Sequence, residues 1–217
     1  HRDLHYPLRR QRQMCIRDSP VPKEFNVKIT GIQMDSRLLT KGDIFLACFG
    51  RNHDARDYID KALKLGCAAV LVESGGGWEG LRVDRGVAII AINNLFAKIS
   101  EIAARFYSRP SMRLNVFGIT GTNGKTSCSQ FIAQSLAGLG HKCGIIGTLG
   151  YGVCGELNES QLTTPDAVFT QKALAEMAVD HIDPVAMEVS SVGLHQKRVE
   201  AVRFDTAIFL SLIHISE

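Results

Sequence analysis

Long apolar runs are absent from this 217-residue chain, and so is any paired-cysteine motif. Without a run of about 18 apolar residues, no membrane-spanning helix is expected. Residues 1–19 are polar and arginine-rich, so they do not match a secretory signal peptide. The six cysteines are scattered, without a Cys-x-x-Cys pair or a histidine ligand pattern. This argues against a zinc site and favours reduced, mostly buried thiols in a cytoplasmic protein.

An excess of positive charge is also missing from most of the chain. Five of the 25 basic residues and two of the 22 acidic residues lie in 1–19, which leaves 20 of each in the remainder. The remainder therefore lacks the basic surface that is typical of nucleic-acid-binding proteins. Its apolar and charged shares are ordinary for a globular protein, and its length allows one large or two small domains.

Both ends differ in character from the part between them. Residues 1–19 show neither periodicity nor a turn pattern, and 10–19 and 212–217 look like translated sequencing adapters. A disordered basic arm is the alternative for the first segment. We therefore exclude 1–19 and 213–217 from the fold, and we expect the native part to be a fragment of a longer protein.

Strand-like and helix-like segments alternate between these ends, which predicts an α/β fold with ligands at the carboxyl ends of parallel strands. Residues 108–111 break the pattern, so we expect one domain over 20–110 and a second over 111–212. Residues 147–162 are glycine-rich and are expected to be irregular. Expected strands are 28–34, 43–49, 68–72, 87–92, 116–119, 142–146, 184–189 and 207–212, and expected helices are 56–65, 95–107, 128–139 and 168–177.

The most informative motif is a glycine-rich turn between a strand-like run and a helical pattern, Thr120-Gly-Thr-Asn-Gly-Lys-Thr126. A helix N-terminus behind such a turn binds phosphates, because its first N–H groups are unpaired. Gly121 and Gly124 let the backbone wrap a nucleotide triphosphate, Lys125 reaches its β- and γ-oxygens, and the Thr126 hydroxyl ligates Mg²⁺. The other predicted ATP-binding residues are Thr122, Asn123 and Ser127.

The loop departs from the strict phosphate-binding pattern. That pattern has a glycine five positions before Gly124, where this chain has Ile119, and Gly118 lies one residue too early. The sequence therefore indicates a variant of the phosphate loop.

Five blocks occur in a fixed order along the chain: Asp35–Arg37, Gly42–Ala47, Thr120–Thr126, Leu162–Asp166, and Met187–Leu194 with Gln196 and Arg198. Together they resemble the Mur ligases. The resemblance covers roughly residues 29–212 and is strongest for the branch that extends UDP-MurNAc-L-Ala-D-Glu during peptidoglycan synthesis. It implies a small α/β domain that binds the UDP-substrate, followed by a truncated parallel-sheet ATPase domain of the P-loop type.

The resemblance implies ATP-dependent amide-bond formation through an acyl phosphate. The substrates would be ATP, UDP-MurNAc-L-Ala-D-Glu and a diamino acid, either meso-diaminopimelate or L-lysine. Lys125 and Glu188 would be catalytic, and Thr126 and Glu188 would hold Mg²⁺, a hard cation that prefers oxygen. A monomer in the bacterial cytoplasm, with no membrane or nucleic-acid partner, is expected. The implied UDP-substrate residues are Met34, Ser36, Thr163, Thr164, Ser190, Gln196 and Arg198.

Simpler interpretations exist for these residues. Glu188 could be a surface carboxylate, Thr163-Thr164-Pro165 a plain turn, and Arg198 a solvated charge. The turn Arg51–His53 aligns with a UDP-contacting turn of the family but is not distinctive.

Two departures from the family limit the expectation. Val192 stands where the family has a histidine after the paired serines, so that histidine's role is not transferred. The segments that hold a second magnesium ion and select the amino acid have no counterpart here, so we expect this chain by itself to be inactive. The alternatives are a non-catalytic UDP-sugar- or nucleotide-binding protein, and a sibling such as MurF, cyanophycin synthetase or folylpolyglutamate synthetase.

Overall fold

The computed structural model describes residues 27–50, 54–160 and 162–211, which fall into two compact units. The units divide between Asn93 and Asn94. Helix α2 (Leu95–Phe106) therefore belongs to the second unit. The expected foreign ends and the turn Arg51–His53 lie outside the described residues.

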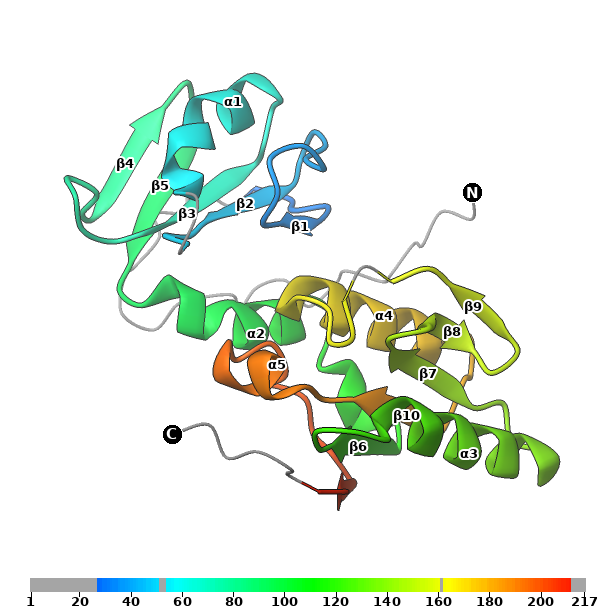
Figure 1. Ribbon diagram of the computed structural model, residues 1–217. Coiled ribbons are helices and arrows are strands. Elements are labelled where there is room, and N and C mark those ends of the chain that lie inside the picture. The colour runs from blue at the N-terminus through cyan, green and yellow to red at the C-terminus, as the bar shows by residue number, and fades with distance from the viewer. Residues whose placement is uncertain (1–26, 51–53, 161, 212–217) are drawn as a thin grey trace. The chain divides into compact units, whose positions relative to one another are not determined.

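The first unit is a five-stranded sheet with the order β1-β2-β3-β5-β4 (Figure 1). The first four of these strands are parallel, and β4 pairs antiparallel with β5. A short 3-10 helix, η3, leads into α1 between β2 and β3. The bounds are β1 Ile32–Gln33, β2 Ile44–Ala47, η3 Ala55–Tyr58, α1 Ile59–Lys64, β3 Ala69–Glu73, β4 Leu81–Asp84 and β5 Val87–Ile92.

The central strands of this unit are buried apolar runs, which is why the sequence predicts them. Every residue of β2 is buried, as are the first four of β3, which is typical of strands in parallel sheets. Phe45 and Val70 pack with Ile59 and Leu63 of α1 in one apolar cluster.

Two expectations for the first unit were wrong. The strand expected over 28–34 is only Ile32–Gln33, and before it Thr30 N–H donates to the Gly42 carbonyl in the turn that precedes β2. Strand β4 was not expected at all. Its four residues, Leu81–Asp84, alternate apolar and polar side chains, but the alternation spans only four positions, all of them exposed at the sheet edge, so the signal is weak.

The second unit is a six-stranded sheet with the order β11-β6-β10-β7-β8-β9. Strands β11, β6, β10 and β7 are parallel, and β8 and β9 extend the sheet as an antiparallel hairpin. The strand bounds are β6 Val116–Thr120, β7 Gly144–Gly147, β8 Gly150–Val153, β9 Glu156–Asn158, β10 Val185–Glu188 and β11 Thr206–Phe209. Besides α2, its helices are η4 Pro110–Arg113, α3 Lys125–Gly138, α4 Ala167–Val179 and α5 Ser191–His195.

Helices α3 and α4 cover opposite faces of this sheet (Figure 1). Adjacent residues of β7 show this directly, since successive side chains of a strand point to opposite faces. Ile145 packs with Ala133 of α3, and Ile146 packs with Leu174 of α4. No described helix is long and apolar enough to cross a bilayer. The α/β class expected from the sequence is confirmed for both units.

The expectation of irregular structure over 147–162 was wrong, because β8 and β9 lie there. Gly150 and Gly152 have φ values of +136° and +139°, which other residues rarely adopt. A Cβ on Gly150 would lie 2.2 Å from the Asn158 carbonyl oxygen of the neighbouring strand. These glycines therefore permit a close strand pair, although glycine is usually a loop signal.

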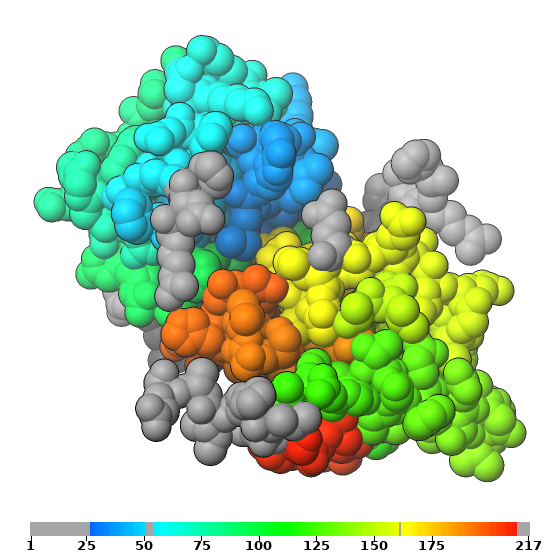
Figure 2. Space-filling view, viewed as in Figure 1, coloured from blue at the N-terminus to red at the C-terminus, as the bar shows by residue number. Residues whose placement is uncertain are grey.

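The opposite edge of the sheet is exposed. Within the described residues, β11 pairs with β6 on one side only. Phe209 is 64% exposed there, and Figure 2 shows the red β11 segment at the surface of the second unit. Strand β11 therefore presents an apolar side chain at an exposed edge of the sheet.

Candidate functional site

The glycine-rich loop lies between β6 and α3, where the sequence predicts it. The helix begins at Lys125, three residues before the expected Cys128. Gly124 precedes it with φ +85°, and Gly121 has φ +143°, so both positions favour glycine. Among the residues that the structure describes, no side chain caps the first turn of α3. Its N-terminal N–H groups and positive dipole end are therefore directed at the loop, as an anion site requires.

Lys125 adds a positive charge at this loop. Its Nζ donates to the Gly121 carbonyl at 2.6 Å and the Thr122 carbonyl at 3.2 Å. The Thr122 N–H donates to the Ser211 carbonyl at 2.8 Å, which ties the segment after β11 to the loop. The side chains of Asn123 and Ser127 are exposed. The loop thus combines an ammonium group with backbone donors, which suits phosphate oxygens.

Gly118, the glycine that lies one residue too early for the strict pattern, belongs to β6. A Cβ at this position would lie 2.7 Å from the Phe204 ring. Gly118 is therefore required for packing against Phe204, and the phosphate loop begins only at Thr120.

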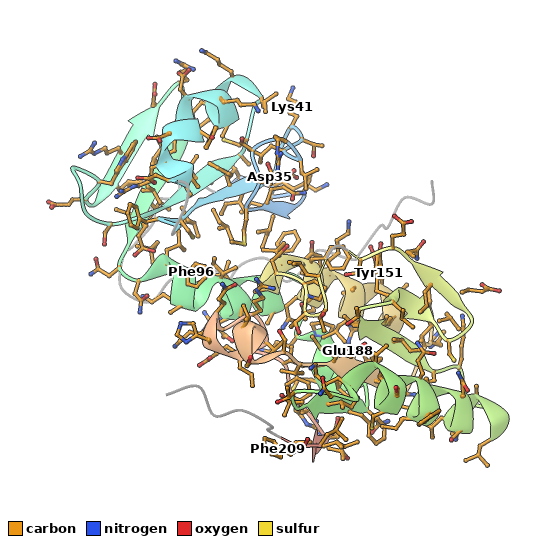
Figure 3. The ribbon with its side chains drawn as sticks, in the orientation of Figure 1. Asp35, Lys41, Phe96, Tyr151, Glu188 and Phe209 are labelled. Atoms are coloured by element: carbon orange, nitrogen blue, oxygen red, sulfur yellow. The ribbon has the colours of Figure 1, made fainter. Side chains whose placement is uncertain are left out.

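Glu188 ends β10 and is 1% exposed, so the interpretation as a surface carboxylate was wrong. Its Oε2 accepts from the Thr126 hydroxyl at 2.9 Å and the Thr148 hydroxyl at 3.1 Å, and its Oε1 accepts from the Thr148 N–H at 3.0 Å. None of the ion pairs among the described residues includes Glu188. Figure 3 shows its label within the second unit, between α4 and α3. A buried carboxylate without a cationic partner is costly, which favours a bound cation.

The donor set of Thr126 and Glu188 fits magnesium. Mg²⁺ is usually held by one or two carboxylates together with substrate phosphates. The described residues contain no cluster of three or more His, Cys, Asp or Glu side chains that would suit a metal held by protein alone. One hydroxyl and one carboxylate beside a phosphate loop match the shared coordination that Mg²⁺ prefers.

Two threonines of the Leu162–Asp166 block lie beside the end of β10. The Thr163 hydroxyl lies 3.0 Å from the Thr148 hydroxyl. Thr164 is 1% exposed, and its hydroxyl donates to the Glu188 carbonyl and accepts from the Ser190 N–H. The block is therefore more than a turn, because it fixes the backbone on both sides of Val189, directly after Glu188.

The remaining predicted residues of this unit join the same cluster. Ser190 caps α5, its hydroxyl accepting from the Gly193 N–H at 3.0 Å. Arg198 donates to the Thr164 carbonyl at 2.5 Å and from Nε to Gln196 Oε1 at 2.9 Å. Arg198 is thus held in place rather than freely solvated. At the start of α5, Val192 is 54% exposed.

Met34 and Ser36 lie in the first unit, directly after β1. Ser36 is buried, and Met34 is partly buried. Between them, the Asp35 carboxylate accepts hydrogen bonds from the Arg37 backbone N–H and from the Arg37 guanidinium. The hydrogen bonds from the Arg37 side chain hold the pKa of Asp35 below its usual range. This turn is compact, but its part in ligand binding stays a prediction.

Sequence reasoning missed Gly147 and Thr148. Thr148 donates a hydrogen bond to the Glu188 carboxylate, and Gly147 leaves the space that the carboxylate occupies. Both residues lie in the stretch expected to be irregular. No spacing rule connects this pair to Glu188 some 40 positions later, so only the parallel pairing of β7 with β10 reveals the contact.

Two family profiles match the chain. The profile described as "Mur ligase family, catalytic domain" matches residues 28–109, and "Mur ligase middle domain" matches residues 119–214. The boundary expected near residue 110 stays a prediction, since the compact units of the structure divide between Asn93 and Asn94.

Curated relatives and a solved structure agree with the profiles. UDP-N-acetylmuramoyl-L-alanyl-D-glutamate–2,6-diaminopimelate ligase of Coxiella burnetii is 49% identical over 187 residues, 86% of this chain and 38% of the relative. The ligase of the same name from Pseudomonas putida is 46% identical over 85% of this chain and 37% of its own length. A solved structure of a ligase of this name superposes with a TM-score of 0.73 at 28% identity, covering 87% of this chain and 38% of its own. The chain thus spans somewhat over a third of the length of these proteins.

Proposed function

Because the chain belongs to the Mur ligase family, we propose that it forms the UDP-substrate-binding domain and the first part of the ATPase domain of a peptidoglycan-synthesis ligase. The reaction we propose for the whole protein joins a diamino acid to UDP-MurNAc-L-Ala-D-Glu with ATP. The observation that carries this proposal is the hydrogen bond between Thr126 and the buried Glu188. It links a phosphate loop to the carboxylate that a magnesium nucleotide requires.

We propose meso-diaminopimelate rather than L-lysine as the diamino acid. The sequence alone leaves both open. Several curated relatives bear 2,6-diaminopimelate in their names, among them the ligases of Coxiella burnetii at 49% identity and of Nitrosomonas europaea at 41%. This choice rests on the names of the relatives.

In the proposed mechanism, ATP phosphorylates the D-glutamate carboxylate of the UDP-substrate. An amine of the diamino acid then attacks the acyl phosphate, the amide forms, and phosphate leaves. The protein contributes mainly positioning and charge neutralisation, as in other phosphoryl transfers. The Lys125 ammonium balances negative charge on the transferring group, and the N–H groups of the loop and of α3 fix the phosphates.

Thr126 and Glu188 are the residues that would hold the magnesium ion of the nucleotide. When bound, Mg²⁺ neutralises phosphate charge and orients the transferred group. Glu188 has no ion pair among the described residues, so its charge is available for this role.

Recognition of the UDP-substrate is proposed for both units. In the second unit, Thr163, Ser190, Gln196 and Arg198 would contact it, while Thr164 supports them through its hydroxyl, which bonds backbone groups of Glu188 and Ser190. In the first unit, Met34 and Ser36 are proposed to contact the uridine. We further propose that the protein acts as a monomer in the bacterial cytoplasm, and that the 217-residue chain by itself has no ligase activity.

The test uses the protein encoded by the uninterrupted coding sequence that contains this chain. It is incubated with ATP, Mg²⁺, UDP-MurNAc-L-Ala-D-Glu and either meso-diaminopimelate or L-lysine, and the products are identified by mass spectrometry. We expect the diaminopimelate tripeptide together with phosphate release. A protein that binds the UDP-substrate but releases no phosphate with any amine would support the non-catalytic alternative. Ligase activity in the isolated 217-residue chain would contradict the proposed inactivity.

A further inference from the structure

We infer that Thr148 is a positioning residue, which fixes the Glu188 carboxylate and, through it, the direction of the hydroxyl groups on both sides. The expected effect of Thr148 on metal binding rests on the proposed function. The contacts between Thr148 and Glu188 involve no ligand. Thr148 belongs to none of the motifs that the sequence singled out.

Thr148 supplies most of the hydrogen bonds that hold the Glu188 carboxylate. The carboxylate accepts three within the described residues, and two of them come from Thr148. Thr148 contacts both carboxylate oxygens, one from its backbone N–H and one from its hydroxyl. A carboxylate held at both oxygens by one residue cannot rotate without losing a bond. Thr148 therefore restrains Glu188 more than Thr126 does.

Gly147, the residue before Thr148, leaves the space that the carboxylate occupies. A Cβ on Gly147 would lie 2.2 Å from Glu188 Oε1. Strands β7 and β10 run parallel, with Ile146 opposite Met187, so Gly147 and Thr148 reach the sheet edge beside Glu188. The pair Gly147-Thr148 thus forms a cradle for the carboxylate, with room from the glycine and hydrogen bonds from the threonine.

The hydroxyl protons around Glu188 have fixed directions. An ionised carboxylate only accepts hydrogen bonds, so the Thr126 and Thr148 hydroxyl protons both point to Glu188. Thr148 has one hydroxyl proton, so its 3.0 Å contact with Thr163 must use the Thr163 proton. The Thr126 and Thr163 oxygens then have only lone pairs to offer a ligand. Lone pairs on Thr126 suit a cation, and those on Thr163 suit a hydroxyl or amide N–H of the UDP-substrate.

Thr148→Val tests this inference, because valine keeps the shape and the backbone N–H but removes the hydroxyl. Thr148→Ser restores the hydroxyl, and Thr170→Val is the matched control, since the hydroxyl of buried Thr170 donates to the Pro165 carbonyl, away from Glu188. The 217-residue chain is titrated with Mn²⁺ in the presence of a non-hydrolysable ATP analogue, and free Mn²⁺ is measured by electron paramagnetic resonance. We expect Thr148→Val to weaken Mn²⁺ binding about 10- to 100-fold, as losses of outer-shell partners do.

Thr148→Ser should stay within about threefold of the unsubstituted chain, and Thr170→Val should match it in Mn²⁺ affinity. Equal affinities for Thr148→Val and the unsubstituted chain would overturn the inference.

A ligand-independent measurement separates this inference from the proposed function. Urea unfolding is followed for Thr148→Val, Glu188→Gln and the double variant. If Thr148 holds Glu188, the midpoint shift of the double variant is smaller than the sum of the single shifts. Additive shifts would overturn the inference. If the shifts are non-additive but the chain does not bind Mn²⁺ and nucleotide, the contact between Thr148 and Glu188 is supported and the proposed ATP site is contradicted.

Discussion

The Thr126 hydroxyl donates to Glu188 Oε2 across 2.9 Å, which joins the first turn of α3 to the end of β10. The contact follows from the sheet, because β6 and β10 are parallel neighbours with Ile119 opposite Glu188. The carboxyl end of one strand carries the phosphate loop, and that of the other carries the carboxylate. This is the edge at which open α/β sheets bind ligands.

Replacing Gly147 by alanine is expected to disturb Glu188 directly. The added Cβ would lie 2.2 Å from Oε1, so either the carboxylate or β7 must shift. Overpacking of this kind typically costs about 1–3 kcal/mol of unfolding free energy. We expect lower stability in urea together with weaker Mn²⁺-nucleotide binding. Gly138→Ala is the control, because its Cβ meets nothing within 4 Å and α3 gains helix propensity. If Gly147→Ala binds the Mn²⁺-nucleotide and unfolds in urea like the unsubstituted chain, the proposed cradle of Gly147 and Thr148 around Glu188 is refuted.

Asp166 of the Leu162–Asp166 block is expected to act through helix capping. Its carboxylate accepts from the Val168 and Phe169 N–H groups at 2.9 Å and caps the N-terminus of α4. Asp166→Ala should lower the free energy of unfolding by about 1 kcal/mol. Asp180→Ala at the other end of α4 should not destabilise, because a negative charge there opposes the helix dipole. The two variants are compared by urea denaturation, and equal destabilisation would contradict the capping role.

Thiol reactivity should follow burial. Burial raises the pKa of the Cys48 thiol to about 12 and that of Cys143 to about 11, from an ordinary value of 9. At pH 8 the Cys48 thiolate is then about a thousandfold scarcer than that of an ordinary thiol. Cys128 and Cys154 are only partly buried and should react with iodoacetamide first. Mass spectrometry of the labelled peptides measures this order, and early modification of Cys48 in folded protein would contradict it.

The same shifts set a direction for alkaline stability. A thiol whose pKa is higher in the folded state keeps its proton while the unfolded chain loses it. The free energy of unfolding should therefore fall as the pH rises above 9. Urea midpoints between pH 8 and pH 10 measure this, and Cys48→Ala should show a weaker fall than the unsubstituted chain.

The phosphate loop can be predicted from the sequence because its information is local. The apolar run of β6, the glycines with positive φ, and Lys125-Thr126 at a helix start are all contained in eleven residues. Glu188 can be placed at a strand end for the same reason, since it follows a short apolar run. The resemblance to the Mur ligases connects these two local features, because both belong to blocks that occur in the family's order.

The hairpin and the cradle could not be predicted in this way. Gly150 and Gly152 carry a loop signal, and only their approach to β9 shows that they serve strand pairing. Strand β4 is exposed along its whole length, and its alternation of apolar and polar residues spans only four positions, which is too short to distinguish it from a loop. Thr148 depends on which strands lie side by side, and the order β10-β7 is a property of the sheet.

The most direct test of the proposed ATP site is Lys125→Ala in the protein encoded by the uninterrupted coding sequence, with Lys142→Ala as a control. Lys125 Nζ lies over the phosphate loop, whereas Lys142 Nζ contacts the Asp180 carbonyl at the surface. The measurement is kcat for diaminopimelate-dependent phosphate release, together with the Kd of the UDP-substrate. We predict a fall in kcat of at least about 100- to 1000-fold, as for loss of one charge-stabilising group, with the Kd changed by no more than a few fold. Near-normal turnover of Lys125→Ala would contradict the proposed role of the loop.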